Sequence, residues 1–228
     1  MSLAKRYLIF VIGVIIQSAG IALITRSTLG SPPISSAPFV ITKFSDYSLG
    51  ELTFVLNALL LLGQALLLKK RFRHIQLLQL PVTVVFAMGL DLFMKIFAWT
   101  LSSHYLINVA VLACGELLLS TGVAMQVIAN VLMLPGEGIV YAISTVCKWE
   151  FGRVKTCFDC TIVATAVILS LTVLHTLTGV REGTLAAALL TGITARFLIS
   201  HCSRFDENGA LVLTWPHAAP KKRRKLPK

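Results

Sequence analysis

The chain has 228 residues, of which 56% are hydrophobic and 14% are charged, and its mean hydropathy is +0.80. A soluble domain of this size needs more charged side chains on its surface, so the composition excludes one and indicates a polytopic membrane protein. The net charge of +11 comes from short basic clusters between apolar segments and at the C-terminus. This distribution is typical of membrane topology and not of nucleic-acid binding.

Six apolar segments follow one another along the chain, and each is near the ~20 residues that cross a bilayer as a helix. They cover residues 7–25, 52–68, 77–100, 105–132, 157–177 and 184–200. The first is longer than the apolar core of a signal peptide, roughly 7 to 15 residues, so we expect an uncleaved first span. The sequence therefore predicts an all-α polytopic membrane protein with six transmembrane helices.

Two segments interrupt this apolar pattern. Residues 30–50 contain three prolines and two charged residues, and we expect a short re-entrant or interfacial helix near 34–44. The second interruption begins with Leu-Pro-Gly-Glu-Gly at residues 134–138, and a short helix is expected near 139–147. Irregular backbone and a carboxylate are tolerated at membrane depth only where they face protein or water.

The two interruptions fall in register when the sequence is compared with itself at a shift of 102 residues. The aligned pairs include Gly20 with Gly122, Pro33 with Pro135, Phe39 with Tyr141, Gly50 with Gly152 and Asn57 with Asp159. Each unit holds three spans, an odd number, so the second unit enters the membrane from the opposite side. We expect two inverted three-span repeats at 1–100 and 101–205, followed by a basic cytoplasmic tail at 206–228.

Basic residues predict the orientation. Clusters at 5–6, 69–73, 148–155 and in the tail fall on one side if six spans alternate, and that side is expected to be cytoplasmic. Both termini are then inside, and the tail is expected to contact anionic lipid. Arg26 and Lys43 are exceptions, because they place positive charge on the outer side together with the Arg181-Glu182 pair.

Glu137 is the first candidate for chemistry. It lies at the N-terminal end of the second short helix, where free backbone N–H groups favour an anion. A carboxylate there has three other uses: it can cap its own helix, bind a cation or carry a proton. Gly136 and Gly138, like Gly30 and Ser31 in the first interruption, would let a ligand approach the main chain.

Three further carboxylates lie within the spans. Glu116 is near the middle of the fourth segment, where an ionised group costs ~2.5 to 3.5 kcal/mol, so it should face the interior of the bundle. Asp159 and Asp91 are nearer the interfaces, and Asp91 has Lys95 one turn away as an available partner. We favour Glu116 and Asp159 as functional groups.

Several uncharged polar residues also lie in the spans: Gln17, Asn57, Gln64, Gln126 and Asn130. Such residues more often join helices than contact substrate. Asn57 stands out because it aligns with Asp159 in the repeat. Arg181, just before the last span, is either an interfacial cap, an external gate or an anion contact.

No metal or cofactor site is expected. Cys157 and Cys160 form one Cys-x-x-Cys pair, but no second pair and no nearby histidine completes a metal site. No nucleophile–histidine–acid pattern or phosphate-binding loop occurs either, so we do not expect an enzyme.

Four motifs resemble a known family: Leu29-Gly30-Ser31-Pro32, the segment 133–138, Phe158-Asp159 and the segment 179–184. They are similar to those of the bacterial YczE/YyaS/YitT family of integral membrane proteins, over the chain up to about Phe205. The resemblance implies a multi-span helical fold in the bacterial cytoplasmic membrane. It assigns no activity and no functional residue.

The sequence favours a small-solute transporter, secondary and working by alternating access. Its substrate-binding or coupling residues are predicted to be Glu137, Glu116, Asp159, Asn57, Gly30, Ser31, Gly136, Gly138 and Arg181. The expected partners are the lipid bilayer and a small-molecule or ion substrate, without nucleic acid, and the oligomeric state stays open. The alternative is a non-transporting assembly or regulatory partner in the membrane, and a membrane-embedded enzyme is the third reading.

Overall fold

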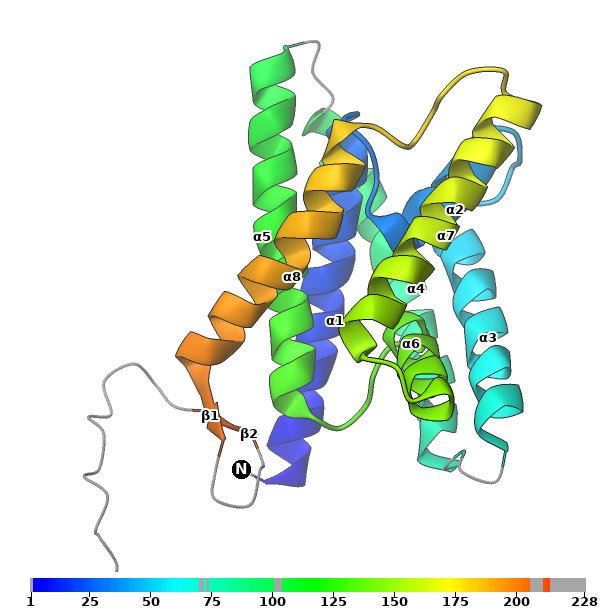
Figure 1. Cartoon of the computed structure of the whole chain (residues 1–228). Coiled ribbons are helices and arrows are strands. Elements are labelled where there is room, and N and C mark those ends of the chain that lie inside the picture. Colours follow the sequence, from blue (N-terminus) through cyan, green and yellow to red (C-terminus); the bar gives the residue numbers. More distant parts are fainter. Residues whose placement is uncertain (1, 70–71, 73, 101–103, 206–210, 214–228) are drawn as a thin grey trace, which may run out of the picture.

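The structure is a computed structural model that describes all residues except 1, 70–71, 73, 101–103, 206–210 and 214–228. Eight α-helices, two short 3-10 helices and a two-stranded ladder are described: α1 Leu3–Arg26, α2 Pro33–Ile41, α3 Leu49–Leu68, η2 His74–Leu78, α4 Gln79–Ile96, η3 Phe97–Thr100, α5 Tyr105–Ala129, α6 Pro135–Cys147, α7 Phe151–Val173, α8 Glu182–Cys202, β1 Ser203–Phe205 and β2 Leu211–Leu213. Figure 1 shows their arrangement.

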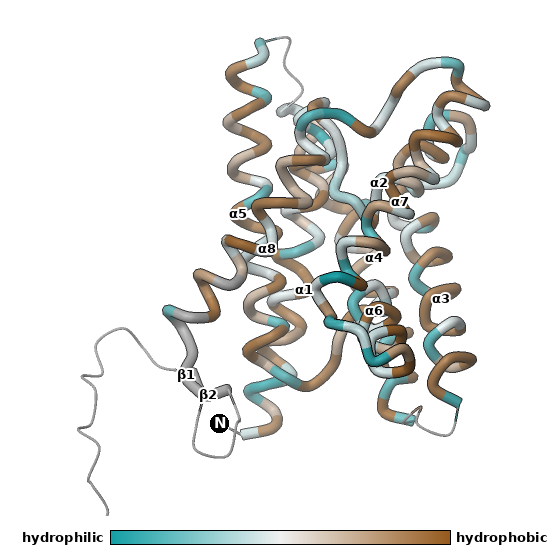
Figure 2. The backbone as a smooth tube through the Cα atoms, viewed as in Figure 1, coloured by the Kyte–Doolittle hydropathy of each residue, from teal (hydrophilic) through white to brown (hydrophobic). Residues whose placement is uncertain are grey.

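Six of the helical segments are long and apolar enough to cross a membrane: α1, α3, the continuous segment from η2 to η3, α5, α7 and α8. Figure 2 shows hydrophobic residues along them, with hydrophilic residues concentrated near their ends and in the connections. The predicted helical fold with six spans is therefore confirmed, and the chain is a multi-pass membrane protein. The antiparallel ladder of β1 and β2 is a short addition after the last helix.

The two short helices occur where the sequence predicts them, but α6 begins earlier than expected. Pro135 occupies its first turn, where a missing N–H costs nothing, so the Pro-Gly-Glu-Gly motif forms the first turn of the helix. Helix α7 also begins early, at Phe151, because Arg153 and Lys155 continue the helix instead of ending it. Hydropathy alone sets the boundary too late, since long basic side chains reach water from a helix end.

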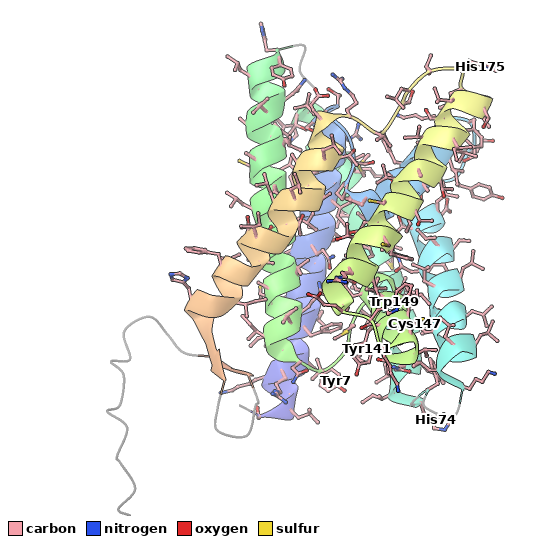
Figure 3. The ribbon with its side chains drawn as sticks, in the orientation of Figure 1. Tyr7, His74, Tyr141, Cys147, Trp149 and His175 are labelled. Carbon is pink, nitrogen blue, oxygen red and sulfur yellow. The ribbon has the colours of Figure 1, made fainter. Side chains whose placement is uncertain are left out.

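Several of the connections between the long helices lie at two opposite ends of the molecule. The N-terminus, the α3–α4 connection and the ladder of β1 and β2 lie at one end (Figure 1). The start of α5 and the α7–α8 connection lie at the other end. Figure 3 places His175 of the α7–α8 connection far from Tyr7 and His74.

Helices α1 and α5 cross closely at the centre because glycines remove the side chains between them. A Cβ atom at Gly13 would lie 3.0 Å from Gly122 O, and one at Gly122 would lie 2.6 Å from Gly13 O. A Cβ atom at Gly20 would lie 2.8 Å from Gly115 O, and one at Gly115 would lie 3.1 Å from Gly20 O. Small residues allow this approach of two membrane helices.

The four glycines form two related pairs. Gly13 and Gly20 lie 102 residues before Gly115 and Gly122. Gly13 contacts Gly122, the equivalent of Gly20, and Gly20 contacts Gly115, the equivalent of Gly13. Beside them, Gln126 Nε2 donates a hydrogen bond to Gln17 Oε1. The contacts at the crossing are thus reciprocal between the two halves of the chain.

The helices group into two bundles, each with its own apolar cluster. The scaffold bundle contains α1, α4, α5 and α8, in which α1 packs against α5 and α4, and α5 packs against α8. Its apolar cluster includes Phe10, Ile24 and Phe86. The short-helix bundle contains α2, α3, α6 and α7, and Ile139 and Val154 belong to its separate cluster. Each half of the chain contributes two helices to each bundle.

The main junction between the bundles is the α3–α4 interface. Asp91 of α4 accepts hydrogen bonds from Ser48 Oγ at 2.7 Å and from Gly50 N at 2.8 Å, both at the start of α3. The described ion pairs do not include one between Asp91 and Lys95; the Ser48 hydroxyl and the Gly50 N–H are the described donors to the Asp91 carboxylate. Helices α7 and α8, by contrast, do not pack along each other in the described residues.

Candidate functional site

The N-terminal ends of the two short helices meet at the centre of the structure. A Cβ atom at Gly136 of α6 would collide with the side chain of Ile34 of α2. These two residues are 102 positions apart, so equivalent points of the two interruptions touch each other. With 13 residues, α6 extends roughly 20 Å and is too short to span a bilayer of about 30 Å.

Glu137 lies in the first turn of α6 and is partly buried. Burial raises the pKa of its carboxyl group above 4.5, which is the main effect, while the positive charge of Lys155 acts in the opposite direction. The negative charge of Asp159 raises the pKa slightly further. Glu137 is therefore an acidic group whose proton is retained more strongly than in water.

Lys155 and Asp159 lie one turn apart on α7, with Lys155 Nζ 2.8 Å from Asp159 Oδ1. Both side chains are largely buried. Together with Glu137 they give a group of two carboxylates and one ammonium at the contact between α6 and α7. Two of the predicted site residues, Glu137 and Asp159, are thus brought into electrostatic contact. Figure 3 places Tyr141, Cys147 and Trp149 along α6 and its connection to α7.

Gln64 of α3 covers the first turn of α6. Its Nε2 donates to Pro135 O at 3.1 Å and to Gln79 Oε1 at 3.2 Å. A Cβ atom at Gly138 would lie 2.5 Å from Gln64 Oε1, and that oxygen has no hydrogen-bond partner among the described residues. Gly138 therefore makes room for a buried amide with an available acceptor. The sequence places Gln64 among residues that join helices, and only the fold shows this acceptor.

Asn57 is buried on the same helix, α3. Its Nδ2 donates to Thr53 O at 2.9 Å within that helix. The hydroxyl oxygen of Thr53 has no hydrogen-bond partner in the described residues. Asn57 and Asp159, which align in the repeat, are thus polar positions on two different helices, α3 and α7. No described hydrogen bond joins them.

Glu116 lies in the scaffold bundle, away from the Glu137 group. It is buried in α5, and its Oε1 accepts hydrogen bonds from Thr191 Oγ1 of α8 at 2.7 Å and from Ser120 Oγ at 3.2 Å. Its Oε2 has no partner among the described residues. The two favoured glutamates therefore belong to different bundles, and no described interaction connects them.

The first interruption is fixed to the α7–α8 connection. Ser31 N and Ser31 Oγ both donate to Gly179 O, at 3.1 and 2.9 Å. Gly30 has φ of +134°, and a Cβ atom there would lie 2.6 Å from Thr184 Oγ1. Arg181 Nη1 donates to Thr28 O at 3.1 Å. Gly30, Ser31 and Arg181 thus form one cluster, separate from the Glu137 group.

Two cavities are described. The larger, about 420 Å³, lies beside the α3–α4 interface and includes Tyr47, Glu51 and Asp91. The other, about 320 Å³, includes Gly30 and Arg181. Neither of the two is lined by Glu116 or Glu137, so in this conformation they do not lead a solute to either carboxylate. No group of His, Cys, Asp and Glu that fits a metal ion occurs in the described part of the chain.

Comparison with known proteins gives a family but no activity. Residues 4–200 match the family model described as Family of unknown function (DUF6198). No curated protein and no solved structure matches the chain. The match supports neither YczE, YyaS nor YitT by name, so that resemblance stays a prediction. Because the matched residues cover nearly all of the helical body, the chain belongs to the DUF6198 family of unknown function.

Proposed function

We propose that the protein is a small-solute secondary transporter that works by alternating access between the two bundles. The observation that carries the proposal is that each bundle is built from corresponding helices of both halves: α1 and α4 with α5 and α8, and α2 and α3 with α6 and α7. Transporters with inverted repeats move one such bundle against the other around a central site.

The reciprocal contacts at a shift of 102 residues support the inverted repeat. The glycine pairs of α1 and α5 exchange places under this shift, and Ile34 contacts its own equivalent, Gly136. Packing agrees: α2 packs against α7, and α6 packs against α3. Each short helix therefore packs against a span of the other half, as a two-fold relation requires.

The proposed substrate site lies where the two short helices meet. Glu137 is the coupling group, because a partly buried carboxyl with a raised pKa exchanges a proton when its surroundings change. Asp159 and Lys155 set its charge balance, and the available oxygen of Gln64 is a hydrogen-bond acceptor for substrate. Glu116 is a second coupling candidate in the scaffold bundle. Access to these groups requires the bundles to separate.

A second function has one observation in its favour. The two cavities do not reach Glu137 or Glu116, which suits a protein that does not pass a solute. The alternative is therefore a non-transporting assembly or regulatory partner of a biosynthetic or signalling complex. The location in the bacterial cytoplasmic membrane, implied by the YczE/YyaS/YitT resemblance, and the inward position of both termini belong to either proposal.

Reconstitution into liposomes separates the two functions. The purified protein is sealed into vesicles with a pH-sensitive dye and supplied with a panel of metabolites. We expect substrate-dependent proton movement for the wild type and for Glu150→Gln, and none for Glu137→Gln. Glu150 is the matched control because its side chain is exposed and pairs only with exposed Arg153 among the described ion pairs.

Two results would contradict the transporter proposal or its site. If the wild type moves no proton or solute from the panel, the partner function is favoured. If Glu137→Gln transports normally, Glu137 does not couple. Orientation is tested separately by a cysteine at Ser103, which lies outside the described residues and should react only from the external side.

A further inference from the structure

Three basic side chains that depart from the positive-inside pattern meet at one cavity. Arg26, Lys43 and Arg181 come from the end of α1, the segment after α2 and the connection before α8, and all three line the cavity of about 320 Å³. The other lining residues are uncharged and include threonines and glycines. Three basic residues of the predicted outer side are therefore gathered at a single concave site.

We propose that this cavity is a binding site for a small dissolved anion that carries a carboxylate or phosphate group. The inference deepens the proposed function. The role of this cavity as the outer entry site for substrate rests on that proposed function. A cavity of this volume is in the range of small-ligand sites, and clustered cations in a concave site raise the local concentration of anions.

The two arginines are held in place and keep donors for a ligand. Arg26 donates from Nε at 2.9 Å and from Nη2 to Met94 O, near the end of α4. Arg181 donates from Nη1 to Thr28 O and from Nη2 to Glu182 Oε1, each at 3.1 Å. These contacts use only part of each guanidinium, and its remaining N–H groups suit the two oxygens of a carboxylate or phosphate.

Lys43 adds a third charge that is bound more loosely. Its Nζ lies 4.5 Å from the centre of the Phe39 ring, which orients the ammonium without neutralising it. Glu182 neutralises part of the charge of Arg181, but both side chains are about half exposed, so water screens this pair. The cavity keeps a net positive charge.

The backbone beside the cavity has an unusual conformation. Thr28, Gly30 and Gly179 all have positive φ, of 61°, 134° and 82°. A β-branched residue such as Thr28 rarely adopts this region, and its carbonyl is the group that Arg181 holds. Strained backbone that persists in a folded protein often occurs at ligand sites.

The repeat does not account for these charges. The positions equivalent to Arg26 and Lys43 in the second half are Ile128 and Thr145, which carry no charge. The inverted repeat therefore provides the shape of both ends of the molecule, whereas this group of three cations around a cavity belongs to one end. Binding of an anion at that end of the molecule explains why the three cations have no counterpart at the other end.

Binding of defined anions tests the proposal. The full chain is placed in nanodiscs of phosphatidylcholine and titrated calorimetrically with inorganic phosphate and succinate, and with glucose and choline as neutral and cationic probes. We expect saturable binding of at least one anion and none of glucose or choline. Lys43→Gln and Arg181→Gln should each weaken binding about tenfold, because each removes one charge-assisted contact.

Lys148→Gln is the matched control, because Lys148 is an exposed lysine outside the cavity. It should bind anions like the wild type. Thermal unfolding of each variant verifies that the fold is retained, and Lys43→Gln is the safer variant because Arg26 and Arg181 also hold backbone carbonyls. Absence of anion binding, or binding that neither substitution weakens, would overturn the proposal.

Anionic lipid headgroups share the phosphate chemistry, so a second set of nanodiscs contains phosphatidylglycerol. Retention of this lipid at the site, with no binding of phosphate or succinate in neutral lipid, would overturn the assignment to a dissolved anion. Competition between succinate and phosphatidylglycerol at the same three residues would support it.

Failure of this inference differs from failure of the transporter proposal. Anion binding without any transport in liposomes leaves the cavity site standing and rejects transport. Transport of a neutral or cationic solute without anion binding rejects the cavity site alone.

Discussion

Helices α3 and α4 of the first half pack along each other, whereas their counterparts α7 and α8 in the second half lie apart (Figure 1). In the first half, Asp91 holds the start of α3 through Ser48 and Gly50. In the second half, α7 packs against α2 and α6, while α8 packs against α5. The two halves have the same order of helices, but in the described part of the chain their last two long helices pack together only in the first half.

This difference bears on the bundle motion that we propose. In that proposal the α3–α4 interface, which joins the scaffold bundle to the short-helix bundle, is the fixed joint. On the opposite side α7 and α8 share no such interface among the described residues, and Ser31 joins the bundles there through hydrogen bonds with Gly179 and Thr184. Rocking about α3–α4 would therefore change the separation of α7 and α8 most, and that motion would expose the site at the short helices.

The largest expected effect comes from breaking the crossing that both halves share. Gly20→Val and Gly122→Val place a side chain against the backbone of the partner helix, so α1 and α5 must separate. Each should lose roughly 3 kcal/mol of stability, which lowers the unfolding midpoint by about 10 °C in detergent. Similar losses for the two variants are expected because the positions are equivalent.

Gly192→Ala is the control for this experiment, since nothing lies within 4 Å of a Cβ atom at Gly192. Its unfolding midpoint should not fall below that of the wild type, because alanine favours a helix more than glycine does. If one glycine of the crossing accepts valine without loss while the other does not, the two halves are not related as we propose.

A smaller effect is expected from making the first half resemble the second. Asp91→Asn removes the charged acceptor of the hydrogen bonds from Ser48 and Gly50. We expect the free energy of unfolding to fall by about 2 kcal/mol. Thermal unfolding should show a midpoint about 5 °C below the wild type. Asp46→Asn, an exposed aspartate before α3, should show no change. Equal midpoints for both variants would remove Asp91 as the joint.

The smallest effect concerns the pH dependence of the second half. Because burial raises the pKa of Glu137 above 4.5, the folded protein binds this proton more tightly than the unfolded chain does. Its contribution to stability is full below about pH 4.5 and is lost as pH rises through the raised pKa, by at most about 1.4 kcal/mol per pH unit.

The measurement is the unfolding midpoint of the wild type relative to Glu137→Gln across this pH range. The difference should decrease as pH rises, and Glu150→Gln should follow the wild type. A difference that does not vary with pH would mean that water reaches Glu137 freely.

Much of the fold follows from the sequence because a bilayer leaves few options. Apolar length alone predicts the six spans, and the prolines at 32–33 and 135 predict both short helices. The start of α7 was predicted too late, because hydropathy does not register basic residues that continue a helix.

The sites depend on contacts that the sequence does not contain. Glu137 and Asp159 meet only because α6 packs against α7, and Glu116 finds Thr191 only because α5 packs against α8. Gln64 looks like any polar residue in a span until Gly138 is placed against it. The convergence of Arg26, Lys43 and Arg181 has one signal in the sequence, namely their departure from the positive-inside pattern.

Distance measurement between spin labels tests the bundle motion most directly. After replacement of the native cysteines, one label pair is placed at Ile168 of α7 and Leu189 of α8, and a reference pair at Leu59 of α3 and Met88 of α4, all exposed positions. Rocking about α3–α4 predicts one narrow distance for the reference pair and two populations for the α7–α8 pair that shift with substrate. A single, unchanged distance for both pairs would contradict it.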